Sequence, residues 1–230
     1  MEQIQNNRVI TDLYRENAQF PGIALDGSDV YLCWQRFVDR HDSLMASCRR
    51  GDEVVWEREI SDGGEVLHPV ILAHGGAIWY AWSEYARENW RILARCYRDG
   101  QWGEVLTVAS GEALFFPRLF TWQGRLHVIW TEQHKGSAAA VLCPLTEAGP
   151  GAAETVSAVG EAYRAGAAEG GDGNLYVAYD GFDGKQYKLF ARARTAAGWS
   201  KEIVVSQGED WASTPWIAAK PDGAVVGWYR

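Results

Sequence analysis

Short apolar runs recur along the chain and are separated by polar or glycine-containing turns. One segment, 68–109, contains four such runs: Val70–Ala73, Ile78–Trp82, Arg91–Tyr97 and Trp102–Ala109. The runs are rich in aromatic and β-branched residues, as strands are. Gly75-Gly76 and Asp99-Gly100 stand between runs, and such pairs suit tight hairpins because glycine tolerates a positive φ. The pattern therefore predicts four antiparallel strands joined by short turns.

This unit is repeated along the chain with a nearly constant period. A proline at the start of the first strand recurs every 48 to 50 residues, with Ala165 in the fourth place: Pro21, Pro69, Pro117 and Pro215. An aromatic residue near the end of the second strand recurs every 48 or 49 residues: Trp34, Trp82, Trp130, Tyr179 and Trp228. A fixed period of this size indicates a repeat array. We therefore predict an all-β protein, a β-propeller of five blades, each a four-stranded antiparallel sheet.

The repeats leave no room for a linker, so we expect one propeller domain over residues 1–230. The repeats run over 16–63, 64–111, 112–159 and 160–208, and the last combines 209–230 with 1–15. The last repeat has only two strands, Trp216–Ala219 and Ala224–Tyr229, before the chain ends. Arg8–Asp12 aligns with a fourth strand, so we expect it to complete the last blade and close the ring. The alternative is a fragment of a larger ring.

Alternation along the strands predicts the core. Both faces of the second strands are apolar, as expected of strands covered by neighbouring blades. The predicted core contains the five repeated aromatics and four residues of the first strands: Ile23, Ile71, Leu119 and Ile217. Cysteines occupy positions where other repeats have small residues, as where Cys96 aligns with Ala193. We expect all four thiols to be buried, reduced and structural, with neither a metal site nor a cofactor.

Charge and composition limit the classes of binding partner and the cellular compartment that we expect. The formal net charge of −8 over 230 residues argues against nucleic acid and anionic membranes, since both require a basic face. No apolar run is long enough for a transmembrane helix, and the polar N-terminus is not a signal peptide. We expect a cytoplasmic protein or a domain excised from a larger one, of unknown oligomeric state.

The repeat also resembles a known family. Pro-x-Ile/Leu is followed by a glycine turn, by a Tyr/Trp-x-Ala-Trp run and by a turn such as Asp99-Gly100-x-Trp102. This pattern resembles the sialidase-like, or bacterial-neuraminidase-repeat, propellers over nearly the whole chain. The Asp-box of that family, Ser-x-Asp-x-Gly-x-x-Trp, is degenerate here, with only part of it retained at Asp99, Gly100 and Trp102. The resemblance therefore implies the propeller fold more strongly than an activity.

Sialidase chemistry is not what this sequence favours. The resemblance implies three arginines on a substrate carboxylate, an Asp acid and a Tyr/Glu nucleophile pair, with one arginine two residues before the first-strand proline. Other residues stand at that position: Gln19, Leu67, Phe115 and Ser213. Arg118 and Arg164 lie nearby but out of register. We keep these two arginines as ligand-binding candidates and expect no sialidase activity.

Acidic residues repeat on one predicted face of the propeller. The loop before the first strand carries an acidic residue in every repeat: Glu16, Glu65, Glu112, Glu161 and Asp210. The end of the second strand adds Glu84, Glu132 and Asp180. These carboxylates could ring the channel mouth and bind a cation, an amine or sugar hydroxyls, or pairs of them could act as acid and base in glycoside hydrolysis. The alternative interpretation is a set of polar turn residues repeated with the blade.

Aromatic residues accompany the carboxylates on that face and suit stacking on sugars: Tyr14, Phe20, Tyr85, Trp90, Phe115, Phe116, Tyr163, Phe182 and Trp211. Several could instead cap the blade core, and we expect Trp90 and Trp211 to be exposed. The five histidines occupy unrelated repeat positions, so we assign them no catalytic role.

The sequence favours a non-catalytic module that binds carbohydrate or another small polar ligand at the channel mouth. The alternatives are a glycoside hydrolase or lyase that uses loop carboxylates, and a protein–protein scaffold. The catalytic residues and the identity of the ligand are left open. The candidate ligand-binding residues are Glu65, Glu112, Glu161, Asp210, Tyr163, Trp211, Arg118 and Arg164.

Overall fold

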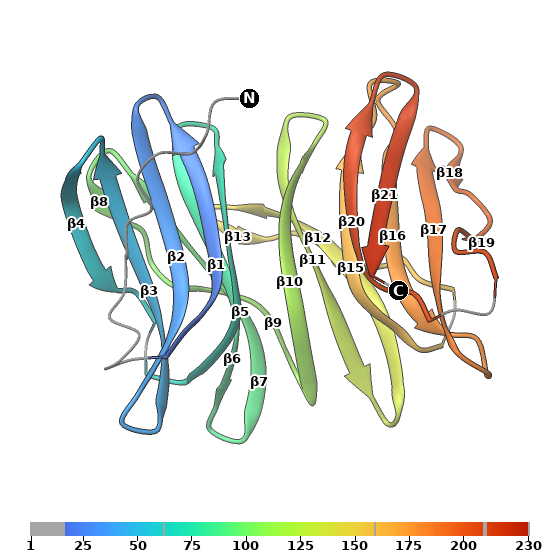
Figure 1. Ribbon diagram of the computed structural model, residues 1–230, viewed down its shortest axis with the longest axis horizontal. Coiled ribbons are helices and arrows are strands. Elements are labelled where there is room, and N and C mark those ends of the chain that lie inside the picture. Colours follow the sequence, from blue (N-terminus) through green and yellow to red (C-terminus); the bar gives the residue numbers. More distant parts are fainter. Residues whose placement is uncertain (1–16, 62, 159, 209–210, 230) are drawn as a thin grey trace.

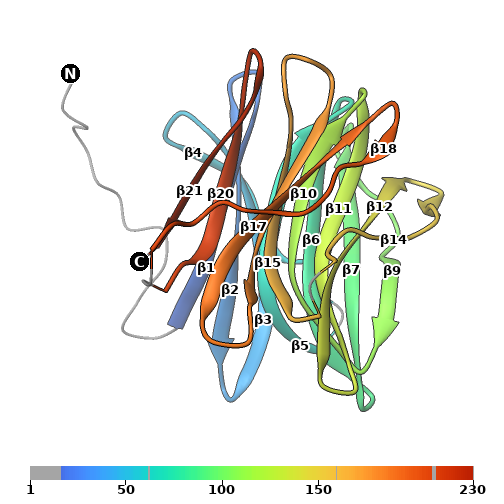
Figure 2. The ribbon, with the colours of Figure 1, turned by 90° about the vertical axis from the view of Figure 1, so that its right-hand side faces the viewer.

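The computed structural model describes residues 17–61, 63–158, 160–208 and 211–229. All regular structure in these residues is β, arranged as five antiparallel sheets that follow one another along the chain (Figure 1). The strands of all five sheets run along roughly one direction, as the turned view in Figure 2 shows. The predicted five-bladed β-propeller is confirmed. No helix able to span a membrane is found in this part of the chain.

Each of the first four sheets begins with three long strands in a meander. The first sheet contains β1 (Asn17–Asp26), β2 (Asp29–Val38), β3 (His41–Arg50) and β4 (Glu53–Glu59). The second contains β5 (Glu65–His74), β6 (Ala77–Ala86), β7 (Asn89–Arg98), β8 (Gln101–Trp102) and β9 (Leu106–Gly111). The third contains β10 (Ala113–Trp122), β11 (Arg125–His134), β12 (Ser137–Thr146), β13 (Gly149–Pro150) and β14 (Glu154–Thr155).

The last two sheets complete the series. The fourth contains β15 (Ala162–Glu169), β16 (Leu175–Phe182), β17 (Tyr187–Thr195), β18 (Gly198–Trp199) and β19 (Ile203–Val204). The fifth contains β20 (Ser213–Lys220) and β21 (Gly223–Tyr229). In sheets two to four, two short strands both pair with the third long strand, so the fourth strand of the blade is interrupted. Arg8–Asp12, predicted to complete the fifth sheet, lies outside the described residues.

The repeated aromatic residues form the core between blades. Four of them, Trp34, Trp82, Trp130 and Tyr179, expose 4% or less of their surface, as predicted. Trp228 is only partly buried. The prediction for Ile23 is wrong, because 65% of this residue is exposed and its side chain lines the central cavity.

The four cysteines are buried and free, as the alignment of repeats predicted. Burial raises the pKa of the Cys33 thiol to about 12 and that of Cys143 to about 11. Both side chains therefore remain neutral thiols at neutral pH and behave as small apolar groups in the core.

The first strand of every sheet contains a bulge at the repeated proline position. The sequence predicted that these prolines open their strands, but Pro69 lies in the middle of β5 (Glu65–His74). The pairing register with β6 shifts between Leu67 and Val70, and His68 has a φ of 53°. Proline cannot donate a ladder hydrogen bond, and a bulge leaves one residue unpaired, so the two features fit together.

The bulge recurs in all five first strands and places one residue of each in the left-handed region. These residues are Phe20 (φ 50°), His68 (φ 53°), Phe116 (φ 55°), Arg164 (φ 40°) and Thr214 (φ 53°). The five register shifts occur at the same position. A non-glycine residue with positive φ is strained, and bulges next to functional sites re-aim side chains. All five of these residues line one cavity at the centre of the molecule.

Candidate functional site at the central cavity

The first strands of the five sheets surround a common cavity. Each contacts the next in chain order, from β1 to β5, β10, β15 and β20. The cavity has a volume of about 1010 Å³ and is lined by residues of all five sheets. Small-molecule sites typically occupy about 300–1,000 Å³. The space is therefore sufficient for one or two sugar rings.

Aromatic side chains form much of the cavity wall. The His68 ring lies between Phe20 and Phe116, with ring centroids 4.9 Å and 4.3 Å away. On the fifth sheet, Trp216 and Tyr229 pack edge to face at 4.8 Å, and both are exposed. Exposed rings around a cavity offer flat apolar surfaces to a ligand.

The charged groups on the cavity wall are cationic. Arg118 and Arg164 line it together with His68, and no Asp or Glu does so among the described residues. The Nε and Nη2 groups of Arg164 donate to the two carboxylate oxygens of Asp180, which is fully buried. The Arg118 guanidinium forms no hydrogen bond or ion pair with any described residue. The cavity therefore carries an unbalanced positive charge in a chain whose net charge is −8.

His68 is neutral in this environment. Loss of solvation, with a smaller contribution from the charge of Arg118, lowers the pKa of His68 to about 4. The ring Nδ1 atom is buried and has no hydrogen-bond partner in the structure. At neutral pH this imidazole carries one N–H donor and one acceptor nitrogen.

A second group of side chains lies at one end of the fourth sheet. Tyr163 pairs with Asp180 in the β15–β16 register, and the backbone N–H of Phe182 donates to the Glu161 carbonyl at 3.0 Å. Residues two apart on a strand, and residues directly opposite on its partner, share one face of the sheet. Glu161 and Asp180 therefore lie on one face as diagonal neighbours. Diagonal neighbours of this kind are about 7–8 Å apart, and their Cβ atoms are somewhat closer.

Aromatic rings cover the same end of this sheet. Tyr187 lies centrally, with ring centroids 6.1 Å from Tyr163, 5.6 Å from Phe182 and 5.5 Å from Trp211. Trp211 is 63% exposed, as predicted. Trp90 was predicted to be exposed, but it is partly buried between Tyr85 and Phe115 at 5.3 Å and 4.6 Å. Of the two tryptophans predicted to be exposed, only Trp211 of the fourth-sheet cluster is.

Three of the other repeated carboxylates serve contacts within the protein, whereas Glu132 is partly buried and forms no ion pair or hydrogen bond with a described side chain. Glu65 accepts a hydrogen bond from the Asp42 backbone at 3.0 Å, and Glu112 lies 3.2 Å from the His134 Nδ1 atom. Glu84 is fully buried, where it pairs with Arg91 and accepts from Trp82 at 3.1 Å. Glu16 and Asp210 lie outside the described residues. No group of three or more His, Cys, Asp or Glu suited to a metal ion occurs in the described ranges.

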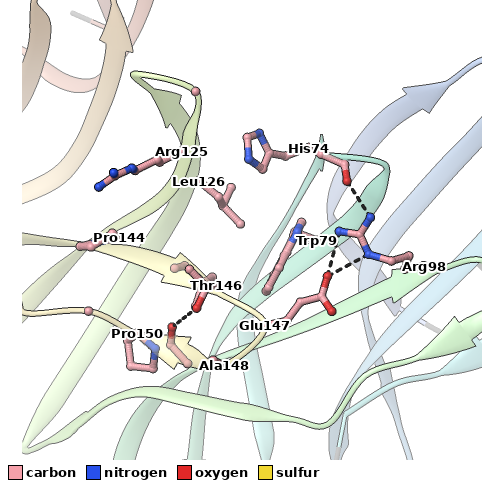
Figure 3. A pocket seen from close by; sticks show the side chains of 15 residues that line it. His74, Trp79, Arg98, Arg125, Leu126, Pro144, Thr146, Glu147, Ala148 and Pro150 are labelled. Carbon is pink, nitrogen blue, oxygen red and sulfur yellow. Dashed lines mark hydrogen bonds and ion pairs between the residues drawn. The ribbon is translucent and has the colours of Figure 1, made fainter.

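A separate cleft lies between the second and third sheets (Figure 3). It contains the turn after β5, whereas the fourth-sheet cluster lies at the beginning of β15. Its volume is about 610 Å³. Arg98 from β7 reaches the Glu147 carboxylate at 2.8 Å and donates to the Gly75 carbonyl at 2.7 Å, so it joins the two sheets. Arg98 and Glu147 neutralise each other, whereas Arg125, which also lines the cleft, forms no ion pair with a described residue.

Comparisons with known proteins show likeness of fold alone. No family model matches the chain, and no curated protein matches it. An α-L-arabinofuranosidase from Lactobacillus brevis has a TM-score of 0.59 and 11% identity, over 93% of this chain and 83% of the other. An endo-arabinase from Bacteroides thetaiotaomicron has 0.57 and 11%, over 91% and 88%. A mannose phosphorylase from Leishmania mexicana, in complex with phosphate ion, has 0.56 and 10%, over 93% and 83%.

These comparisons correct the functional expectation. The sequence favoured a non-catalytic binding module, whereas the similar structures are enzymes that act on carbohydrates. The comparisons thus favour the alternative of a glycoside hydrolase and contradict the binding module. They support the propeller fold, while membership of the sialidase-like family and functional Asp-boxes are not shown.

His68 and Thr214 were not predicted as ligand-binding residues, and Phe116 was named only among the aromatic residues of the candidate face. A usable signal was present, because the residue before the repeated proline occupies the bulge in every blade. When the five repeats are aligned, the residues at that position are the ones whose side chains line the cavity, including Arg164. Arg118, out of register with the sialidase pattern, lines the same cavity immediately after Pro117.

Proposed function

We propose that this protein cleaves glycosidic bonds, with its substrate bound at the mouth of the central cavity. Three observations support this proposal. Five first strands converge on one cavity of about 1010 Å³, exposed aromatic rings stand at its wall and at the nearby end of the fourth sheet, and enzymes acting on arabinosides share the fold over most of the chain. The main support is the convergence of the five first strands, because it gives a sugar one cavity lined by all five sheets.

Glu161 is our candidate for the proton donor to the leaving oxygen. Its carboxylate is partly buried and forms no ion pair or hydrogen bond with any described residue. It immediately precedes β15 and lies three residues before Arg164, which corresponds to about 10 Å along the backbone. Its charge and that of Arg164 both act on Tyr163, so the three side chains are neighbours. A carboxylic acid beside aromatic rings is the group that glycoside cleavage requires for protonation.

Asp180 supplies the second carboxylate on this face, but in a different role. It is fully buried and held by Arg164, so a substrate cannot touch it in this conformation. We assign Asp180 as a positioning residue that fixes the Arg164 guanidinium at the cavity wall.

The finer assignment within this class is also a proposal. The degenerate repeat supports a distant relation to sialidase-like propellers, whereas the arginine position of that family is occupied by other residues, such as Leu67 and Phe115. We infer that the substrate is a sugar other than sialic acid.

Hydrolysis of aryl glycosides by wild type and by Glu161→Gln tests the proposal. The panel contains aryl arabinofuranosides, xylosides, mannosides and glucuronides, and released phenol is measured. Glu161→Gln removes the proton, so kcat is expected to fall by about 100-fold or more. Glu104→Gln is the matched control, because Glu104 is an exposed carboxylate between β8 and β9, away from the cavity. Turnover of none of these glycosides by wild type, or full activity of Glu161→Gln, would contradict the proposal.

A further inference from the structure

Arg118 is in an unusual situation for an arginine. It follows Pro117 at the bulge of β10, is half-buried and lines the central cavity. No described residue forms an ion pair or hydrogen bond with its guanidinium, and burial lowers the pKa of this group. Arginines are rarely buried without a partner, since the loss of solvation is costly. An unpaired arginine facing a cavity therefore indicates that an anion from outside the chain supplies the partner.

The other polar groups of the cavity also offer donors. Arg164 uses Nε and Nη2 for Asp180, so its Nη1 group remains available. Its Cζ atom lies 5.9 Å from the Phe116 ring centroid, which places the guanidinium over the same aromatic wall that His68 contacts. His68 adds one N–H from a ring whose Nδ1 atom has no partner. The three side chains come from β5, β10 and β15, three successive first strands.

The surroundings strengthen the attraction for an anion. Phe20 and Phe116 enclose the His68 ring, and apolar walls strengthen electrostatic interactions because they exclude water. The described lining contains no carboxylate to compete for Arg118. The planar fork of an arginine matches the two oxygens of a carboxylate, sulfate or phosphate group.

We propose that Arg118, Arg164 and His68 form an oxyanion-binding site at the centre of the cavity. Its ligand is the acidic group of a sugar, such as a carboxylate or sulfate, or free inorganic phosphate. The site itself is argued from the charges of the cavity, and only its assignment to a substrate rests on the proposed function. If glycosidic bonds are cleaved here, the substrate is an acidic sugar or the reaction uses phosphate.

Calorimetric titration of the full chain at constant ionic strength tests the site. The probes are inorganic phosphate, glucuronic acid and the neutral sugar methyl glucoside. Wild type is expected to bind at least one of the two anions at least ten-fold more tightly than the neutral sugar. Arg118→Ala is expected to weaken that binding by at least ten-fold, and Arg118→Lys less, because lysine keeps the charge but loses the fork.

Arg58→Ala serves as the matched control, because Arg58 is exposed on the outer strand β4. Thermal unfolding of each variant identifies loss of the fold, and in that case Arg118→Gln replaces Arg118→Ala. Binding by phosphate alone would assign a free anion as the ligand, and binding by glucuronic acid alone would assign the acidic group of the sugar. Both results support the site.

Equal binding of anions and neutral sugar by wild type would overturn the site, as would unchanged anion affinity in Arg118→Ala. The Glu161→Gln variant separates the two proposals. It is expected to bind the anion as wild type does, even if no glycosidic bond is cleaved. The oxyanion site can thus stand or fall independently of the catalytic assignment.

Discussion

Replacement of His68 by phenylalanine tests whether the His68 ring is desolvated beside Arg118, as the structure indicates. Phenylalanine should be tolerated at this position, because Phe20 and Phe116 occupy the equivalent bulge in neighbouring blades with φ of 50° and 55°. The substitution keeps an aromatic ring between these two residues and removes the titrating group. Any change in pH dependence therefore reports on His68 itself.

The expected effect follows from the two pKa values. In the unfolded chain His68 takes up its proton near the ordinary value of 6.5, and in the folded protein its pKa is about 4. Between these values the unfolded state binds more protons, so stability is full above pH 6.5 and falls as the pH drops toward 4. At pH 5 the loss relative to pH 7 is about 2 kcal/mol in the free energy of unfolding, as an order of magnitude.

Urea unfolding at pH 7 and pH 5 measures this difference in wild type and in His68→Phe. Other groups titrate in both proteins, so the difference between the two pH dependences isolates His68. Wild type is expected to lose about 2 kcal/mol more than the variant between these pH values. An equal loss in both proteins, or an NMR titration of His68 centred near 6.5, would refute a desolvated His68 beside Arg118.

Two further substitutions test the rim and the packing of the first two blades. Trp211→Ala removes a ring that is 63% exposed, so KM is expected to rise by roughly ten-fold while the thermal midpoint stays unchanged; an unchanged KM would remove Trp211 from the site. Gly64→Ala places a methyl group 2.6 Å from the Glu84 Cδ atom, so the free energy of unfolding in urea is expected to fall by about 1–3 kcal/mol. Wild-type stability of Gly64→Ala would show that the buried Glu84 side chain can move aside.

Much of the fold could be predicted because its signals are local and repeated. The aromatic near the end of each second strand is buried between blades in four repeats, and an alignment of the chain with itself finds it. The bulges were missed for a physical reason. A proline cannot donate a ladder hydrogen bond, so Pro69 was expected at the start of a strand. A bulge leaves one residue unpaired, and a proline can therefore also lie inside a strand at a bulge.

The candidate site was less accessible from the sequence. The repeated acidic residues suggested one ring of carboxylates at the channel mouth. In the structure, other side chains hold several of them, as Arg91 and Trp82 hold the buried Glu84. These contacts depend on side chains from neighbouring strands, and sequence spacing does not give their directions. Ile23 shows the same limit, since an apolar residue on a first strand can face either a neighbouring blade or the central cavity.

The most direct test of the account is a crystal structure of Glu161→Gln soaked with glucuronic acid. The account predicts that the sugar binds at the central cavity, with its carboxylate against the Arg118 guanidinium and its ring near the side chain at position 161. Sugar bound only elsewhere, for example in the cleft crossed by the Arg98–Glu147 ion pair, would contradict the central cavity as the functional site.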